Sequence, residues 1–425
     1  MKSIKRLAAV ALLIALSLGL YVPASALAEP DVELSAASAL VVNLETGTEI
    51  YSKNADERRS IASVTKMMTA LVAYELCGGA LKETTVTVPL DVWSYFDTYD
   101  ISVSGLVSGE SMSLYDMMHA LLLPSGNEAA VSIACHFGYA EFINKMNEKA
   151  AALGMSNSHF VNPHGLDADG HYSTAHDLII LTKAFIAATP IYEITQKTSY
   201  TLPETGYAEA RTIYTTNYAQ IESSDVYYSP VRGIKTGSTD LAGRCLVSTA
   251  VYGNTSYAIV LLGSGSSVFS ETVSLYRWCF NNLSYYSPIS INTAVAEIKV
   301  KSSLRKDALV LYSAGELYSL FDDSKPGEVS YEIHLPESIK APIAMGQVIG
   351  TADVSYHGVK TGTIVLVSRE EVKRNIFVSA LEFIGAIVLS TPGMIVLGAL
   401  FLILIIYLYY IKIALPRAAK KRRRR

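Results

Sequence analysis

Two residues near position 65 have the types and spacing of a nucleophilic site. Ser63 and Lys66 stand three positions apart at the start of a segment with helical periodicity, so both side chains would lie on one helix face. A serine hydroxyl is a weak nucleophile until a neighbouring base takes its proton. A lysine that is desolvated and crowded by another cation can be neutral enough to act as that base. At a helix N-terminus, the dipole would also stabilise negative charge developing beside Ser63.

Two further motifs follow in the chain and carry complementary groups. Ser125-Gly-Asn127 falls between two apolar helical segments, where the hydroxyl can relay a proton and the carboxamide can hold a substrate amide. Lys235-Thr-Gly237 falls in a segment expected to be a strand. There the ammonium of Lys235 and the hydroxyl of Thr236 can bind a terminal carboxylate, and Gly237 lets a substrate backbone approach closely. The three motifs together predict a serine acyl-transfer site.

Each motif is weak on its own, because the chain repeats all three patterns in its C-terminal part. The repeats are Ser303-Leu-Arg-Lys306, Ser290-Ile-Asn292 and Lys360-Thr-Gly362. Their order along the chain is wrong, and no helical segment begins at Ser303. We therefore expect the catalytic groups to come from the first set.

The first set of motifs lies in a region that mixes strands with helices. Alternation of apolar residues predicts a hairpin over residues 36–53 and strands over residues 84–88, 200–202, 243–252 and 256–262. Apolar spacing of three and four predicts helices over residues 60–76, 114–123, 129–137, 142–153, 175–188 and 269–283. This mixture indicates an α/β or α+β domain that ends near residue 287.

The pattern changes after residue 288. Short β-like runs alternate with turns and show almost no helical period, which predicts a small all-β domain over residues 288–370. In residues 371–390, apolar side chains recur at steps of three and four opposite charged ones, as in an amphipathic helix at a membrane interface. A solvated linker helix packed on the β domain is the alternative for that segment.

Both ends of the chain carry membrane-related signals. Residues 1–28 combine a basic start, an apolar run and a small-x-small cleavage site, which is typical of a signal peptide. Residues 391–413 are apolar enough to form a transmembrane helix, and residues 414–425 form a strongly basic tail. Because basic clusters stay on the cytoplasmic side, we expect a single-pass cell-membrane protein whose catalytic domain, residues 29–287, is extracytoplasmic and whose tail is cytoplasmic.

The charge distribution argues against nucleic acid as a partner. The formal net charge is −4; with three positive charges in residues 1–28 and eight in residues 412–425 set aside, the remainder carries −15. Such an acidic body repels a phosphate backbone. The cysteines form no Cys-x-x-Cys pair, so no metal site is expected, and the serine chemistry needs no cofactor. We interpret them as small buried thiols: Cys77, Cys135, Cys245 and Cys279.

Taken together, the motifs resemble those of the D-alanyl-D-alanine carboxypeptidases, the low-molecular-mass penicillin-binding proteins of type 5. Besides the three motifs and their flanking residues, the likeness extends to Phe160–Asp167, Tyr172–Asp177 and Ala341–Gly350. It spans about residues 35–370. It implies a β-lactamase/D,D-peptidase-like fold: an antiparallel five-stranded sheet flanked by helices, followed by a β-rich domain that holds it off the membrane.

The resemblance also implies a role for each catalytic residue. Ser63 would be the acylated nucleophile, Lys66 the base for acylation and deacylation, and Ser125 the proton relay. The backbone N–H groups of Ser63 and Ser238 would form the oxyanion hole. A position between Ser125 and Lys235 would suit a lysine with a depressed pKa.

The substrate-binding residues follow in the same way. Asn127 would contact a substrate amide, and Lys235 with the assistance of Thr236 would bind the terminal carboxylate, on a strand that continues through Gly237 and Ser238. The expected partners are peptidoglycan stem peptides, β-lactam antibiotics as acylating inhibitors, and the membrane.

Two features depart from the family pattern, and two residues invite another mechanism. Glu128 stands where the family usually has aspartate, which we interpret as a conservative structural change. A membrane-crossing segment is present besides an amphipathic helix, whereas the best-known members rely on an amphipathic anchor. His164 and Asp167 could form a triad with Ser63, but the family's base is lysine, so a structural role is expected for both.

Weaker candidates lie near the motifs. Arg232 could help to bind a carboxylate, although a solvated arginine at a strand end is the simpler interpretation. Trp93 and Tyr95 follow a predicted strand and could border the cleft.

Other functions would use the same motifs. A D,D-endopeptidase would cut cross-linked dimers at this site. A β-lactamase is disfavoured, because we find no Glu-x-x-x-Asn segment of the sort that would position a hydrolytic water. A catalytically inactive, penicillin-recognising wall sensor would have no need to keep Ser63, Lys66, Ser125 and Lys235. We expect a serine-type D-Ala-D-Ala carboxypeptidase that trims the terminal D-alanine of stem peptides.

Overall fold

The computed structural model describes residues 30–97, 101–304, 307–323, 329–356 and 358–414. These residues form two compact units: residues 30–286 with 318–323, and residues 287–317 with 329–414. The expected signal peptide and nearly all of the expected basic tail lie outside the described residues.

The first unit, which contains the three motifs, is built on an antiparallel sheet of five strands in the order β2-β1-β9-β8-β7. The predicted hairpin over residues 36–53 is confirmed as β1 and β2, which pair directly. β7 carries Lys235-Thr-Gly237 and is an edge strand, paired on one side only. The strands are β1 (Ser38–Asn43), β2 (Glu49–Lys53), β7 (Val231–Thr239), β8 (Gly243–Tyr252) and β9 (Thr255–Ser264).

Helices occupy the segments with helical spacing. The predicted helix over residues 60–76 begins as a short 3-10 helix, η2 (Ala62–Thr65), where Ala62 takes a left-handed backbone conformation with φ +46°. The helices are α2 (Lys66–Leu76), α3 (Leu114–Leu122), α4 (Asn127–His136), α5 (Tyr139–Leu153), α6 (Ala175–Ala187), α7 (Thr189–Thr195) and α8 (Val268–Asn282).

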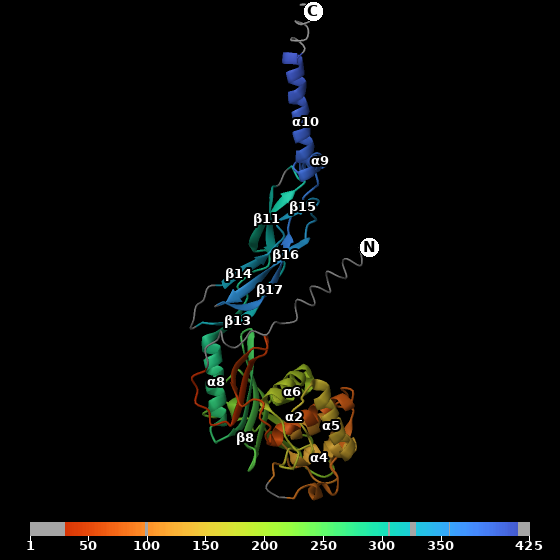
Figure 1. The fold of residues 1–425 in the computed structure, drawn as a ribbon. Helices are drawn as coiled ribbons and strands as arrows, with labels where there is room; N and C mark the ends of the chain where they lie inside the picture. The colour runs from red at the N-terminus through yellow and green to blue at the C-terminus, as the bar shows by residue number, and fades with distance from the viewer. Residues whose placement is uncertain (1–29, 98–100, 305–306, 324–328, 357, 415–425) are drawn as a thin grey trace, which may run out of the picture. The chain divides into compact units, whose positions relative to one another are not determined.

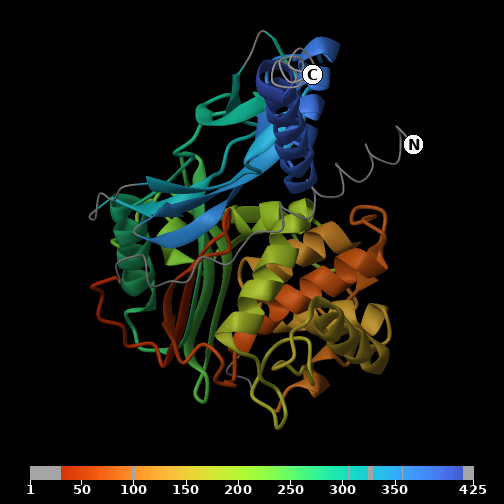
Figure 2. The same ribbon diagram turned by 45° about the horizontal axis from the view of Figure 1, so that its top comes forward.

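The sheet is covered on both faces, because side chains alternate along its strands. On β1, Leu40 and Val42 belong to one core with residues of α2 to α7, whereas Ala39 and Val41 belong to a second core with α8. Figure 1 shows α8 on the opposite side of the strands from α2 and α6, and the turned view of Figure 2 shows the same layers. The first core positions η2 beside β7.

Short strand pairs complete this unit. β3 (Thr85–Thr87) pairs with β4 (Ser111–Ser113), and β5 (Ser199–Leu202) pairs with β6 (Arg211–Tyr214). β10 (Leu283–Tyr286) pairs with β13 (Ser319–Asp322), so a strand from the sequence expected to form the β-rich domain lies with the first unit.

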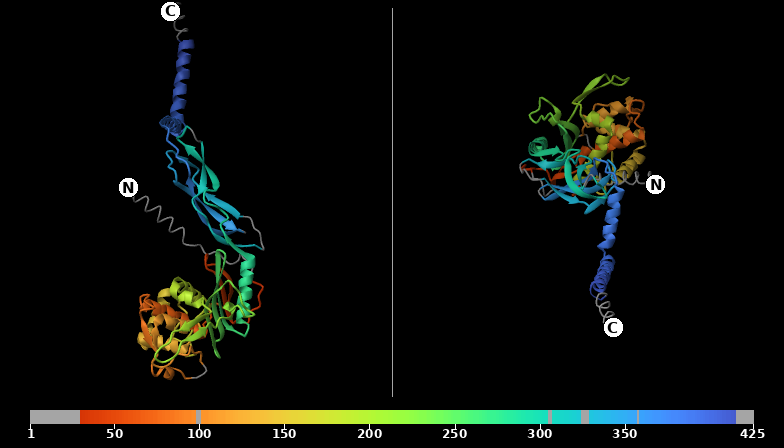
Figure 3. Two further views of the ribbon diagram at one scale, coloured as in Figure 1. Left: turned by 180° about the vertical axis from the view of Figure 1, so that it is seen from behind. Right: turned by 90° about the horizontal axis from the view of Figure 1, so that it is seen from above.

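The second unit is a six-stranded sheet in the order β14-β16-β17-β12-β11-β15, followed by two helices. Leu309, Leu311, Ile364 and Leu366 are central to its core, which also includes Val372. The strands are β11 (Ala294–Lys301), β12 (Ala308–Ser313), β14 (Val329–His334), β15 (Ser338–Lys340), β16 (Val348–Tyr356) and β17 (Val359–Ser368). The helices are α9 (Ile376–Val388) and α10 (Thr391–Tyr409), and Figure 3 shows this unit from behind.

The apolar segment at the end of the chain is one long helix. The helix from Thr391 to Ile413 is long and apolar enough to cross a membrane, and none of it is buried within the described protein. Ser390 caps its N-terminus by accepting a hydrogen bond from the backbone of Gly393 at 3.2 Å.

Candidate active site

Ser63 lies in η2, at the turn that leads into α2, and opens onto two cavities of the first unit. The larger has a volume of about 740 Å³ and the smaller about 260 Å³. Ser63, Ser102 and Ser238 line both cavities. Ser63 is therefore accessible from two directions, as a nucleophile that joins an acyl pocket to a leaving-group pocket would be.

Lys66 is completely buried behind Ser63 and makes three hydrogen bonds. Its Nζ lies 2.8 Å from Ser63 Oγ, 2.7 Å from Asn127 Oδ1 and 2.8 Å from the backbone oxygen of His164. Burial, and next the positive charge of Lys235, lower the pKa of Lys66 well below its ordinary 10.5, while the carboxylate of Glu128 acts in the opposite direction. The amine therefore loses its proton more readily than an exposed lysine does.

Ser125 is positioned by the short loop between α3 and α4. Its backbone is left-handed, with φ +66°, and its side chain lines the smaller cavity together with Ser63. Its hydroxyl is buried and has no hydrogen-bond partner among the described residues. A hydroxyl at the wall of a cavity can exchange a proton with a group bound there, which suits the expected relay.

The Lys-Thr-Gly motif lies on β7 beside η2. Lys235 is almost fully buried, and this burial lowers its pKa to about 7. Its Nζ donates a hydrogen bond to the backbone oxygen of Thr236 at 3.0 Å. The Thr236 hydroxyl lies 2.5 Å from that of Thr216 and lines the smaller cavity. The ammonium of Lys235 is not among the groups that line either cavity, although its charge acts on Lys66.

Gly237 is required by packing within the protein, which differs from the expected close approach of a substrate. A Cβ at this position would lie 3.0 Å from the backbone oxygen of Ile61, from Ala62 Cβ and from the backbone nitrogen of Ser63. The absence of a side chain lets η2 lie directly on β7. The backbone nitrogen of Ser63 is thereby held next to the strand that carries Ser238.

His164 and Asp167 support the site structurally, as expected. The His164 carbonyl binds Lys66, its ring accepts from the Leu166 backbone at 3.2 Å, and burial lowers its pKa to about 3. Asp167 accepts hydrogen bonds from Ser60 at 2.6 Å and from Thr239 at 2.9 Å. No bond from either residue to Ser63 is found in the described part of the chain.

Of the weaker candidates Trp93, Tyr95 and Arg232, only Tyr95 lines one of the two cavities. Tyr95 lines the larger cavity, whereas Trp93 does not. Arg232 donates to the backbone oxygens of Ser229 and Val231 and lines neither cavity. In the second unit, the lysine of the repeated Lys-Thr-Gly pattern, Lys360, forms an ion pair with Asp353 at 2.7 Å.

Arg244 was not foreseen from the sequence. It stands on β8 directly opposite Ser238 on β7, so the two side chains share one face of the sheet, and it lines the smaller cavity. Its guanidinium makes no hydrogen bond or ion pair within the described residues. Its position nine residues after Lys235 in the β7–β8 hairpin was the only available signal.

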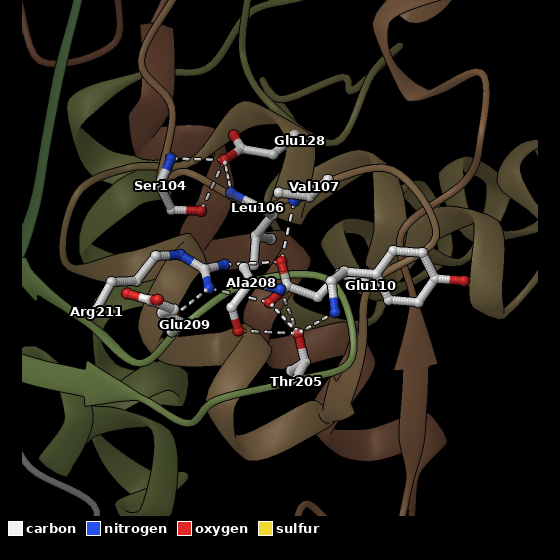
Figure 4. Close-up of polar contacts among 10 residues, drawn as sticks. Ser104, Leu106, Val107, Glu110, Glu128, Thr205, Ala208, Glu209 and Arg211 are labelled. Carbon is white, nitrogen blue, oxygen red and sulfur yellow. Dashed lines mark hydrogen bonds and ion pairs between the residues drawn. The ribbon is translucent and has the colours of Figure 1, made fainter.

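Glu128 and the segment before β4 were also missed. Glu128 is buried, and it binds Ser104 and the backbone of Leu106, as Figure 4 shows. In the same view Glu110 binds Arg211. Sequence reasoning treated Glu128 as a conservative change, because nothing in the pattern showed what its carboxylate would contact.

Comparison with known proteins identifies the family of this chain. The family model described as D-alanyl-D-alanine carboxypeptidase matches residues 24–266, and that of the penicillin-binding protein 5 C-terminal domain matches residues 284–374. The D-alanyl-D-alanine carboxypeptidase DacF of Bacillus subtilis is 30% identical over 359 residues, which cover 82% of this chain and 88% of that protein.

Other relatives extend the comparison to structure and activity. The D-alanyl-D-alanine endopeptidase of Escherichia coli is 33% identical over 258 residues, covering 58% of this chain and 77% of that protein. The crystal structure of penicillin-binding protein 5 from Haemophilus influenzae matches with a TM-score of 0.61 and 26% identity, covering 80% of this chain and 98% of that one. On these matches and on its site, the chain belongs to the D-alanyl-D-alanine carboxypeptidase family.

Proposed function

We propose that this protein is a membrane-anchored serine carboxypeptidase that removes the terminal D-alanine from the stem peptides of bacterial peptidoglycan. The observation that carries this proposal is the arrangement around Lys66. A neutral amine has two hydrogens and one lone pair. If the amine of Lys66 is neutral and its two hydrogens are donated to the oxygens of Asn127 and His164, its lone pair is left for the hydroxyl of Ser63, 2.8 Å away. This is the geometry that a general base needs.

The reaction follows from this geometry. Ser63 Oγ bonds to the carbonyl carbon of the penultimate D-alanine while its proton passes to Lys66. The C–N bond then breaks, and the departing amine of the terminal D-alanine receives, through the hydroxyl of Ser125, the proton that Lys66 took from Ser63, so that Lys66 is neutral again. Water attacks the acyl ester, again with Lys66 as base, which releases the shortened peptide and returns a proton to Ser63.

The remaining motif residues bind the substrate in this proposal. Asn127 contacts a substrate amide, and the backbone N–H groups of Ser63 and Ser238 stabilise the oxyanion. The terminal carboxylate is bound in the smaller cavity by Thr236 with the charge of Lys235 behind it. Arg244 contributes a second cation at the cavity wall, and a guanidinium remains charged at every physiological pH.

The same site accounts for inhibition by β-lactams. A β-lactam presents a strained amide carbonyl and a carboxylate, so Ser63 would attack it as it attacks the D-Ala-D-Ala bond. The resulting acyl-enzyme would persist, because no leaving group departs from the cavity. Penicillin is therefore both an inhibitor and a label for the nucleophile.

The membrane topology belongs to the same proposal. Residues 1–28 act as the signal peptide, residues 391–413 cross the membrane once, and the basic residues 414–425 remain in the cytoplasm. About 34 Å of helix is available at 1.5 Å per residue, enough for the hydrocarbon core. α9, of which no residue is buried in the protein, lies at the extracytoplasmic interface.

The central test is mass spectrometry of the purified protein after incubation with penicillin. A single adduct should appear on the peptide that contains Ser63, and it should be absent from the Ser63→Ala variant. In parallel, a pentapeptide ending in D-Ala-D-Ala should release one equivalent of free D-alanine. A protein that neither forms the adduct nor releases D-alanine would be the inactive wall sensor.

A D,D-endopeptidase is the second candidate, favoured by the 33% identity to the Escherichia coli endopeptidase. It would use the same nucleophile but accept a cross-linked peptide in place of the terminal D-alanine. Purified cross-linked dimers offered beside uncross-linked pentapeptide separate the two activities. Faster cleavage of the dimers would assign the protein to the endopeptidase class.

A further inference from the structure

A segment that precedes β4 forms a wall of the cleft. Ile101 lines the larger cavity, and Ser102 lines both cavities beside Ser63. The backbone oxygen of Ser102 also accepts a hydrogen bond from the backbone nitrogen of Asn127, at 2.9 Å. The position of this wall therefore bears on the nucleophile and on the first residue of α4.

Glu128 holds this wall from inside the protein. Its Oε1 accepts hydrogen bonds from the backbone nitrogen of Ser104 at 2.6 Å, from the Ser104 hydroxyl at 2.8 Å and from the backbone nitrogen of Leu106 at 3.3 Å (Figure 4). The side chain of Glu128 is completely buried. Ser104 and Leu106, which it binds, are almost completely buried. Without this carboxylate, two backbone N–H groups would lose their partner in the interior.

The wall is also pressed against the loop that carries Ser125. A Cβ on Gly126 would lie 2.7 Å from the hydroxyl oxygen of Ser104 and 2.8 Å from the backbone oxygen of Ala120. Glu128 therefore lies where the wall, the end of α3 and the loop before α4 are in contact. Asn127 and Glu128 are successive residues of α4, so one helical turn presents an amide to Lys66 and a carboxylate to the wall.

The charge of Glu128 also acts on the amine of Lys66. Two charged groups act on this amine: Lys235 on β7 lowers its pKa, and Glu128 on α4 raises it. The nearby ring of His164 has a pKa of about 3 and is uncharged at neutral pH. The second oxygen of Glu128, Oε2, has no hydrogen-bond partner among the described residues although it is buried.

We propose that Glu128 is a positioning residue of the reaction, whose carboxylate fixes residues 102–106, of which Ser102 lines the cleft, and places a negative charge next in the chain to Asn127, which binds the amine of Lys66. The inference rests on the proposed role of Lys66 as the base. Glu128 touches neither the substrate nor Ser63 in this arrangement. It acts through the wall and through the protonation of the lysine.

Glu110 provides a matched control, because it fastens the other end of the same segment. It is completely buried, accepts from the Val107 backbone at 3.0 Å, and forms a two-point ion pair with Arg211 at 2.7 and 3.0 Å (Figure 4). Its charge is not among those that act on Lys66. Glu110→Gln therefore loosens the segment without altering the field at the base.

The experiment compares Glu128→Gln, Glu128→Asp and Glu110→Gln with the wild-type protein. The rate of D-alanine release from an N-acylated peptide ending in D-Ala-D-Ala is measured from pH 5 to pH 10. Loss of the negative charge in Glu128→Gln favours the neutral amine, so the rising limb of kcat/KM should move to lower pH by roughly 0.5 unit or more. In Glu110→Gln, the rising limb of the pH profile of kcat/KM should stay at the same pH as in the wild-type protein.

Glu128→Asp separates the two parts of the role and covers the case of a Glu128→Gln variant that does not fold. The shorter side chain keeps the charge but withdraws it from Ser104, so kcat/KM should fall by about tenfold while the rising limb keeps its wild-type pH. If Glu128→Gln has the same limb as Glu110→Gln, or if Glu128→Asp keeps full kcat/KM, the inference is overturned. Penicillin labelling of Ser63 in the wild-type protein tests the proposed function separately.

Discussion

At the scale of single residues, the site depends on two buried amines with different tasks. Lys66 is surrounded by acceptors and faces the nucleophile, so it must be neutral to work. Lys235 must be charged to attract a carboxylate, yet burial lowers its pKa to about 7. The two requirements overlap over a limited pH range.

The first prediction concerns this pH range. Both amines have a lowered pKa, so the neutral form of each appears at a lower pH than in an exposed lysine. As pH rises, kcat should increase when Lys66 loses its proton, and the KM of a carboxylate-ended peptide should increase above about pH 7 as Lys235 loses its charge. Steady-state kinetics from pH 5 to pH 10 measure both; a KM that is constant across pH 7 would contradict the role of Lys235.

The second prediction concerns Arg244. Arg244→Gln should lower kcat/KM for a peptide ending in D-Ala-D-Ala by roughly 10- to 100-fold, mainly through KM, because a charge-assisted hydrogen bond to the carboxylate is lost. A peptide with an amidated C-terminus should be affected little. Arg232→Gln is the control, since Arg232 binds only backbone oxygens outside the cavity. Equal losses in the two variants would remove Arg244 from the site.

At the scale of elements, the contact between η2 and β7 fixes the nucleophile. η2 can lie on β7 only because Gly237 has no side chain, and this contact holds the backbone nitrogen of Ser63 in place. A strand normally needs side chains to pack against its neighbours, so a glycine in the middle of one marks a close approach.

The third prediction follows from that contact. Gly237→Ala should lower the free energy of unfolding by about 1–3 kcal/mol, because the new methyl group crowds two backbone atoms. It should also reduce kcat more than this loss of stability explains, since the oxyanion donor on Ser63 must shift. Gly206→Ala is the control, because a Cβ there meets nothing within 4 Å. Thermal denaturation and kcat measured on both variants give the comparison.

The elements themselves could largely be predicted from the sequence. The hairpin over residues 36–53 and the helices from residue 114 to residue 188 follow from local periodicity, which short-range patterns report well. The left-handed Ala62 could not be predicted, since no local signal favours that conformation for alanine. The pairing of β13 with β10 was equally hidden, because contacts between distant segments leave no trace in local alternation.

The site, too, could be predicted only in part from the sequence. Ser63, Lys66 and Asn127 are joined by hydrogen bonds, and Ser125 lines the smaller cavity beside Ser63, whereas Lys235 lines neither cavity. The hydrogen bonds of Glu128 to the segment before β4, and the place of Arg244 at the wall of the smaller cavity, had no local signal in the sequence. Only the folded structure shows which groups a buried carboxylate or an unpaired guanidinium will meet.

At the scale of the whole molecule, the segments after the β unit carry the proposed attachment to the membrane. Val372 is part of the core of the second unit and pairs with Ile343, so the folded unit continues to residue 372. α9 begins at Ile376 with large apolar side chains exposed, Phe377 and Phe383 among them. α10 then follows after Ser390.

The fourth prediction separates the proposed roles of α9 and α10 in membrane binding. A chain that ends at Arg374 should be recovered in the soluble fraction, and one that ends at Ser390 should bind vesicles reversibly through α9. The full chain should resist extraction by salt and require detergent. All three should release D-alanine from a soluble peptide at the same rate. A chain ending at Ser390 that still requires detergent would assign the anchor to α9.

The four thiols have a practical consequence. None is joined to another in the structure, although all four lie within the described residues. Folding of the catalytic unit therefore needs no oxidative step and no disulfide isomerase, and a reducing compartment should not harm it. A chain that begins at residue 29 should therefore fold inside an ordinary bacterial host, and reductant in the buffer should leave its turnover unchanged.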